Sequence, residues 1–389
     1  MIRHLSTALL ALSLGACGSM DSMNPIDWLS SEESVVQPAE LVELPQSLAL
    51  RTLWSTSVGA GADDKRIKLV PFVHGGRVYA ADGEGEVRAF DSTSGRVIWS
   101  RETGLEIAGG PGVGEGLVLL GTSNAELVAL EAESGQERWR ARVSSEILAV
   151  PTIARGVAVA YTIDGKLYGF DAASGERKWV YDRETPVLTL HGSSSPVISG
   201  QLVICGFASG RLAAVELDSG ALVWDVAVTA PRGRSELERM VDIDRDPLVV
   251  NGIVFVTTYQ GEMAAVSEET GTVLWRRELS AYAGMGRDNR QLFVSDAEDH
   301  LWAIDPRNGS ALWRNKKLEG RRITGPAVVG NHVVVGDFEG YLHLLSSEDG
   351  RMEGRIRIGD SPMSTPPIVA NGVIYAYGRG GELAAITLP

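Results

Sequence analysis

The sequence predicts an all-β fold, an eight-bladed β-propeller of four-stranded antiparallel blades. Seven of the nine tryptophans recur at intervals of 38 to 51 residues, at Trp54, Trp99, Trp139, Trp179, Trp224, Trp275 and Trp313. Glycine makes up 45 of the 389 residues against only 16 prolines, which predicts many tight turns. A repeat of about 40 residues that holds several short strands has the size of one propeller blade.

Each repeat contains the signals of four strands. A glycine stands four residues before the tryptophan in six units, at Gly95, Gly135, Gly175, Gly220, Gly271 and Gly309. A proline stands 28 residues before the tryptophan in five units, at Pro71, Pro111, Pro151, Pro196 and Pro247. Strictly alternating segments such as 87–91 predict strands with one buried face. Because the tryptophans recur at one structural position, we expect each indole to pack between blades rather than stack on a ligand.

Counting the units gives eight, of which the last is incomplete. In the sixth unit Met285 replaces the proline, and in the seventh Gly354 stands where the tryptophan is expected. The eighth unit stops without its tryptophan strand, whereas Trp54 has no blade before it. We therefore predict that residues 51–58 supply the missing strand. The propeller would then span 51–389, and its ring would close by pairing the N-terminal strand with the C-terminal blade.

The N-terminus predicts export and a lipid anchor. Residues 1–16 have a basic start and an apolar stretch too short to span a bilayer, which is typical of a signal peptide. They lead into Leu14-Gly15-Ala16-Cys17, which resembles the lipobox of bacterial lipoproteins, so we expect lipidation of Cys17; a plain signal peptide is the alternative. Gly18 rather than Asp after the cysteine favours the outer membrane. Residues 17–50 would then be the lipidated cysteine and a flexible tether.

Composition argues against several classes of function. The net charge of −14 disfavours binding to nucleic-acid phosphates. The six histidines lack the close spacing of a zinc site, and Cys205, the one cysteine besides Cys17, is expected to be a buried core residue. No nucleophile elbow or phosphate loop with its following lysine is present. We expect no catalytic residues, no metal and no cofactor.

The repeat is interrupted in two neighbouring places. The longest interval, between Trp224 and Trp275, contains residues 230–246, where charges of both signs surround a few apolar residues. This segment predicts either a solvated loop with a helical turn or a docking loop with apolar anchors inside a charged rim. The preceding interval adds residues 186–192, which suit an extended, partly exposed edge. Insertions in a propeller map to loops, so blades three to five are expected to share one irregular face.

The repeated motif with glycine four residues before tryptophan resembles the repeats of pyrroloquinoline-quinone dehydrogenases. Those enzymes are much longer and often carry adjacent cysteines, whereas the two cysteines here are far apart. A quinone-dependent periplasmic oxidoreductase is therefore kept as an alternative function that rests on fold analogy. A propeller scaffold of another envelope complex is a further alternative.

Several segments together resemble the BamB family, the lipoprotein propellers of the outer-membrane β-barrel assembly machinery. The resemblance rests on the lipobox, the closing strand 54–59, the segment 235–244 and the stretches 333–343 and 348–351. It implies a non-enzymatic scaffold, anchored by lipid to the periplasmic side of the cell outer membrane. Its partner would be BamA, bound through the POTRA domains, with unfolded outer-membrane proteins as further candidate clients.

The resemblance also implies a partner-binding surface. Carried over by motif, its residues are Leu188, Leu190, His191, Arg211, Asp242 and Asp244. The family usually has arginine where this chain has His191, which would weaken a charge contact at neutral pH. The two leucines would supply buried area. Asp242 and Asp244 would either contact the partner or hold the loop by pairing with Arg211.

Overall fold

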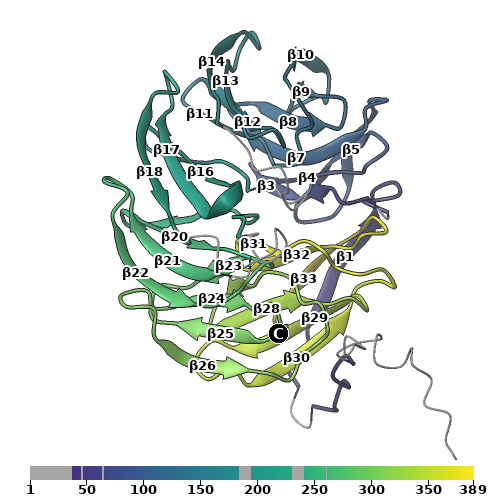
Figure 1. Ribbon diagram of the computed structural model, residues 1–389. Coiled ribbons are helices and arrows are strands. Elements are labelled where there is room, and N and C mark those ends of the chain that lie inside the picture. Colours follow the sequence, from purple (N-terminus) through teal and green to yellow (C-terminus); the bar gives the residue numbers. More distant parts are fainter. Residues whose placement is uncertain (1–36, 45–46, 64, 184–193, 230–240, 260) are drawn as a thin grey trace, which may run out of the picture. The chain divides into compact units, whose positions relative to one another are not determined.

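The computed structural model describes residues 37–44, 47–63, 65–183, 194–229, 241–259 and 261–389. Residues 38–389 form one compact unit. Within the described residues this unit contains eight sheets, each with four antiparallel strands, and one short 3-10 turn, η1 (Ala208–Gly210). Figure 1 shows the sheets following one another around a ring. The predicted eight-bladed propeller is therefore confirmed.

The first four blades follow the chain in order. Blade one consists of β3 (Phe72–His74), β4 (Arg77–Ala81), β5 (Glu86–Asp91) and β6 (Val97–Glu102). Blade two consists of β7 (Ile107–Gly114), β8 (Leu117–Thr122), β9 (Glu126–Glu131) and β10 (Glu137–Arg142), with β2 (Lys68–Leu69) added in parallel beside β7. Blade three consists of β11 (Thr152–Ala154), β12 (Val157–Tyr161), β13 (Leu167–Asp171) and β14 (Arg177–Tyr181). Blade four consists of β15 (Val197–Ser199), β16 (Leu202–Phe207), β17 (Arg211–Glu216) and β18 (Leu222–Ala227).

The last four blades complete the ring. Blade five consists of β19 (Leu248–Val250), β20 (Ile253–Thr257), β21 (Glu262–Ser267) and β22 (Val273–Glu278). Blade six consists of β23 (Met285–Arg287), β24 (Leu292–Ser295), β25 (Leu301–Ile304) and β26 (Ala311–Asn315). Blade seven consists of β27 (Ala327–Val329), β28 (His332–Gly336), β29 (Tyr341–Ser346) and β30 (Met352–Arg357). Blade eight consists of β31 (Ile368–Ala370), β32 (Val373–Tyr377), β33 (Glu382–Thr387) and β1 (Arg51–Ser57).

The ring closes as the sequence predicts. Strand β1 pairs antiparallel with β33, from Arg51 opposite Thr387 to Ser57 opposite Glu382. Figure 1 shows β1 beside β33, at opposite ends of the colour range. The chain ends therefore share one sheet, which removes the free edge that an incomplete eighth blade would expose.

Each repeated tryptophan packs on the next blade and seals one joint. The indole N–H of Trp54 donates to the carbonyl of Ser92 at 3.0 Å, and that of Trp139 donates to Ala172 at 2.8 Å. The glycine of the following turn makes room for the ring, since a Cβ on Gly95 would lie 2.6 Å from Trp54. Its φ of +70° also belongs to the left-handed region that glycine adopts without strain. These contacts confirm that the indoles pack between blades.

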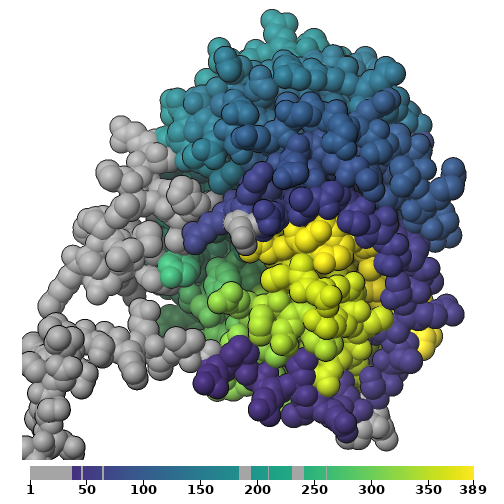
Figure 2. Space-filling model, turned by 90° about the vertical axis from the view of Figure 1, so that its right-hand side faces the viewer, coloured from purple at the N-terminus to yellow at the C-terminus, as the bar shows by residue number. Residues whose placement is uncertain are grey.

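Blade seven lacks this tryptophan, and the chain before β1 covers the corresponding place. The amide of Leu48 donates to the carbonyl of Glu353 on β30 at 2.7 Å, and Leu48 and Leu50 pack on the apolar cluster between blades seven and eight. Leu44 packs on the neighbouring cluster that holds Met352. Figure 2 shows this N-terminal segment, in purple, lying along the C-terminal blades, in yellow and green.

No helix among the described residues is long and apolar enough to cross a membrane.

Candidate functional site

Three of the predicted surface residues can be placed. Arg211, Asp242 and Asp244 are described, whereas Leu188, Leu190 and His191 lie outside the described residues, as does Cys17. The three placed residues belong to blade four and to the connection from blade four to blade five. These three residues and their neighbours form the described part of the irregular face of blades three to five.

Arg211 forms part of an ion-pair group that joins blades three and four. It begins β17, and its Nε lies 3.0 Å from Oδ1 of Asp225 on β18. Arg183, which follows β14 of blade three, places a guanidinium nitrogen 2.6 Å from Oδ2 of the same carboxylate. The Arg183 guanidinium also lies 5.6 Å from the centroid of the Phe207 ring. All three charged side chains stay partly exposed, so a bound partner could reach them.

The two arginines keep Asp225 charged. Burial raises the pKa of this carboxyl, but hydrogen bonds and positive charge from Arg211 and Arg183 outweigh it, and its pKa is lowered overall. The ion pair that the structure gives Arg211 is thus with Asp225, not with Asp242 or Asp244. This finding replaces the loop-holding pair that the sequence offered as one alternative.

The segment Val241–Asp244 closes the joint between blades four and five. Val241 and Ile243 are each 2% exposed, and Ile243 occupies the space that a Cβ on Gly206 would need. The amide of Tyr259 donates to the carbonyl of Asp242 at 3.0 Å, and the amide of Ile243 donates to the carbonyl of Phe207 at 3.3 Å. The apolar side chains anchor the segment, and the acidic residues alternate with them.

Asp242 and Asp244 differ in burial and form a repelling pair. Asp242 is 3% exposed, and Asp244 is half-buried. Burial, followed by the nearby charge of Asp242, raises the pKa of Asp244 to about 7, against the opposing influence of Arg245 and Lys68. With this pKa, the Asp244 carboxyl is expected to change charge near neutral pH.

A second charged group lies next to this segment and connects four parts of the ring. Lys68 on β2 forms an ion pair with Asp246, just before β19, and its Nζ donates to the Ser195 hydroxyl at 2.8 Å. The amide of Ser195 donates to Asp246 at 2.6 Å, and the amide of Val150 donates to the Ser195 hydroxyl at 3.0 Å. Burial lowers the pKa of the Lys68 ammonium against the opposing charge of Asp246. Arg245 donates to the carbonyl of Tyr282, which extends the network toward blade six.

Neither Lys68 nor Ser195 was predicted from the sequence, because both lie in connections that do not repeat. One signal was present: Asp242, Asp244 and Asp246 alternate along the chain, so the acidic pattern continues to a third residue.

Two other polar features of the described residues are a cysteine and a carboxylate–histidine cluster. Cys205 is fully buried among apolar side chains, which confirms its predicted place in the core, and burial raises the pKa of its thiol well above the ordinary value. Asp296, Glu298 and His300 offer ligand atoms within 4.8 Å of one another. Arg314 lies in the same cluster, 3.1 Å from Glu298, and supplies the positive charge there.

Comparison with known proteins identifies relatives over nearly the whole chain. The family described as "Outer membrane protein assembly factor BamB" matches residues 50–109, 83–315 and 303–388. The chain is 52% identical over 349 residues to the protein of that name from Alkalilimnicola ehrlichii, covering 90% of this chain and 91% of the relative. It is 48% identical over 388 residues to the one from Pseudomonas aeruginosa, covering both chains fully.

Solved structures match the fold as well. The crystal structure of BamB from Moraxella catarrhalis has a TM-score of 0.79 and 26% identity, covering 87% of this chain and all of that one. The quinohemoprotein alcohol dehydrogenase from Comamonas testosteroni has a TM-score of 0.69 at 13% identity, covering 90% of this chain and 78% of that one. The second match shows a shared fold alone.

Proposed function

The chain belongs to the BamB family of outer membrane protein assembly factors, and from this premise we propose that it is a non-enzymatic scaffold subunit of the outer-membrane β-barrel assembly machinery. It binds the POTRA domains of BamA and so assists the insertion of outer-membrane proteins. A lipid on Cys17 anchors it to the periplasmic side of the outer membrane.

One observation supports this proposal above the others: the irregular face of blades three to five presents reachable charge on a rigid base. The Arg183–Asp225–Arg211 group is partly exposed and fixed by strands on both sides. The neighbouring segment Val241–Asp244 is anchored by buried Val241 and Ile243. A scaffold surface requires fixed side chains rather than a reactive group, because preorganisation reduces the entropy lost on binding.

In this proposal, Leu188 and Leu190 bring apolar area to the interface and Arg211 provides a charge contact. Asp242 and Asp244 act mainly through the segment that they belong to, since Asp242 is buried and Ile243 beside it anchors the chain. His191 contributes little charge at neutral pH because the ordinary pKa of histidine is about 6.5.

The test is binding of the chain without residues 1–17 to the POTRA region of BamA from the same cell, measured by titration calorimetry. We expect Leu188→Ala/Leu190→Ala to abolish binding. The matched control is Leu222→Ala/Leu274→Ala, which removes two leucines that are 51% and 52% exposed on the outer strands. Circular dichroism checks the fold of each variant. Equal loss in both double variants, or no binding by the wild type, would contradict the proposal.

A further inference from the structure

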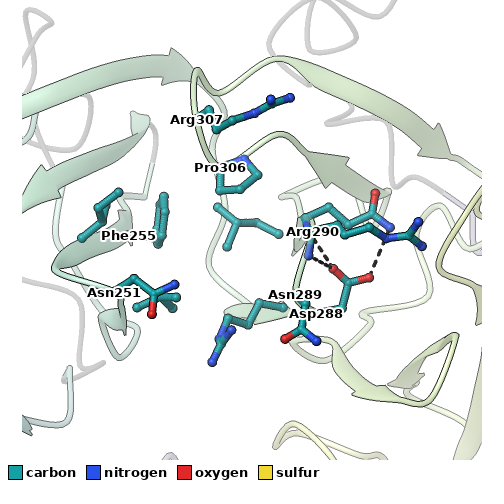
Figure 3. A pocket seen from close by; sticks show the side chains of 12 residues that line it. Asn251, Phe255, Asp288, Asn289, Arg290, Pro306 and Arg307 are labelled. Atoms are coloured by element: carbon teal, nitrogen blue, oxygen red, sulfur yellow. Dashed lines mark hydrogen bonds between the residues drawn. The ribbon is translucent and has the colours of Figure 1, made fainter.

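A hollow of about 210 Å³ lies at the joint between blades five and six, away from the face described above. Its floor is apolar and is formed by Val250, Ile253, Phe255, Leu292 and Pro306. Three arginines line it as well: Arg287, Arg290 and Arg307. Figure 3 shows Asn251 and Phe255 of blade five facing Pro306, Asn289 and Arg290 of blade six. The hollow is smaller than a typical drug-sized site of roughly 300 Å³ or more, so it suits a group the size of one amino-acid side chain.

The hollow exists here because blade six departs from the repeat. In each of the other seven blades, two residues connect the first two strands, as Asn251 and Gly252 do between β19 and β20. In blade six, four residues connect β23 to β24, from Asp288 to Gln291. The longer turn brings Asn289 and Arg290 to the joint, where they form one wall.

The joint between blades one and two shows how an arginine can fill this place. There Arg77, the first residue of β4, donates to the carbonyl of Ala132 at 3.0 Å and pairs with Glu133 at 2.6 Å. At blades five and six, Ile253 begins β20, and the indole of Trp275 bonds the carbonyl of Pro306 as Trp99 bonds that of Ala132. Ile253 cannot bridge the joint as Arg77 does, so the space stays open.

The charge at the two joints is also reversed, because Arg307 stands at the position of Glu133. Asp305 pairs with Arg307 at 2.7 Å, and Asp288 accepts the amides of Arg290 and Gln291 at 2.6 and 2.8 Å. Arg287 and Arg290 are exposed, and within the described part of the chain neither guanidinium has an ion pair. Asp288 also lines the hollow, but the three arginines outnumber Asp288 and the paired Asp305, so positive charge remains in excess beside the apolar floor. This excess favours an anion that carries an apolar group.

We propose that this joint is a binding site for a compact apolar carboxylate, with the apolar group on the floor and the carboxylate between Arg287 and Arg290. The C-terminal residue of a protein chain and a free amphiphilic carboxylic acid both have this chemistry. A planar guanidinium matches a carboxylate in two hydrogen bonds, which a neutral amide cannot reproduce.

The first experiment titrates the chain without residues 1–17 with N-acetyl-leucine and with N-acetyl-leucinamide, its neutral analogue. Methyl NMR signals of Ile253 and Leu292 report on the floor. For a ligand of about twelve non-hydrogen atoms we expect a Kd of about 1 mM. The amide should bind at least tenfold more weakly. Equal shifts with acid and amide, or no shift at about 10 mM acid, would overturn the proposal.

The second experiment changes the site. Arg287→Gln/Arg290→Gln should weaken acid binding at least tenfold, whereas Arg155→Gln, an exposed arginine in the corresponding turn of blade three, should leave it unchanged. Ile253→Arg/Arg307→Glu recreates the arrangement of Arg77 and Glu133 and should abolish binding by filling the hollow. If this variant does not fold, the result for Arg287→Gln/Arg290→Gln tests the proposal by itself. Unchanged binding in Arg287→Gln/Arg290→Gln would refute the site.

A final comparison distinguishes the two sources of the carboxylate. A hexapeptide with a free C-terminal leucine is compared with the same peptide carrying a C-terminal amide, and with hexanoate. Binding of the free-ended peptide at least as tight as that of N-acetyl-leucine indicates a protein C-terminus. Binding of the small acids alone indicates a free carboxylic acid. If the amidated peptide and the free-ended peptide shift the methyl signals of Ile253 and Leu292 equally, recognition of a carboxylate from either source is contradicted.

Discussion

The outer and inner parts of the ring are held together by different means. On the outside, a tryptophan at every joint except that between blades seven and eight packs on a glycine of the next blade and bonds a turn carbonyl, as Trp139 does at Gly175 and Ala172. On the inside, the connections between blades hold the ring, through Lys68, Ser195 and the segment Val241–Asp246. The outer contacts repeat with the sequence, and the inner ones do not. The repeated contacts hold neighbouring blades together. We therefore expect the partner-binding surface where the repeat is interrupted.

The largest expected effect comes from breaking an outer joint. Trp139→Ala removes an indole that is 8% exposed, together with its hydrogen bond to Ala172. We expect the free energy of unfolding in urea to fall by about 3–5 kcal/mol. Leu312→Ala, at a leucine that is 52% exposed on the outer strand β26, is the control and should change it by less than about 0.5 kcal/mol. A loss below about 1 kcal/mol in Trp139→Ala would show that the indole does not seal the joint.

A somewhat smaller effect is expected from releasing the inner segment. Ile243→Ala leaves a cavity beside Gly206 and should lower the unfolding free energy by about 2–4 kcal/mol. It should also weaken BamA binding, whereas Trp139→Ala, if still folded, should bind as the wild type does. Unfolding in urea measures the stability of each variant, and titration calorimetry measures its affinity for BamA. Together they distinguish a contact that only stabilises the ring from one that also positions the binding face. Equal binding by both variants would argue against this division.

The smallest effect concerns the pH dependence set by Asp244. Its folded pKa of about 7 exceeds the ordinary value of 3.8, so the folded state binds the proton more tightly than the unfolded chain. The group therefore makes stability fall as pH rises from about 4 to about 7. At pH 8 the free energy of unfolding of Asp244→Asn should exceed that of the wild type by about 1 kcal/mol, after allowance for solvent screening. This difference in unfolding free energy should disappear by about pH 4. Parallel pH profiles of the two proteins would show that Asp244 is not perturbed.

The division between repeated and unrepeated contacts also explains what the sequence could predict. The eight blades and the packing of each indole follow from spacing alone, because each is made many times along the chain. The closing strand at Trp54 follows from the same count, because the last unit lacks its tryptophan strand. Lys68 and Ser195 could not be found in that way, since they meet through long-range folding of single connections. The same holds for the pairing of Arg211 with Asp225, and for the longer turn of blade six, which only the strand register shows.

The most direct test of the proposed scaffold compares one arginine from each region. Arg211→Gln removes a charge from the face of blades three to five, and Arg183 remains to hold Asp225. Arg77→Gln removes a similarly half-buried, ion-paired arginine from a regular joint. We predict that titration with the POTRA region of BamA shows at least a tenfold weaker Kd for Arg211→Gln and an unchanged Kd for Arg77→Gln. Equal affinity of the two variants, with both folded, would contradict the account.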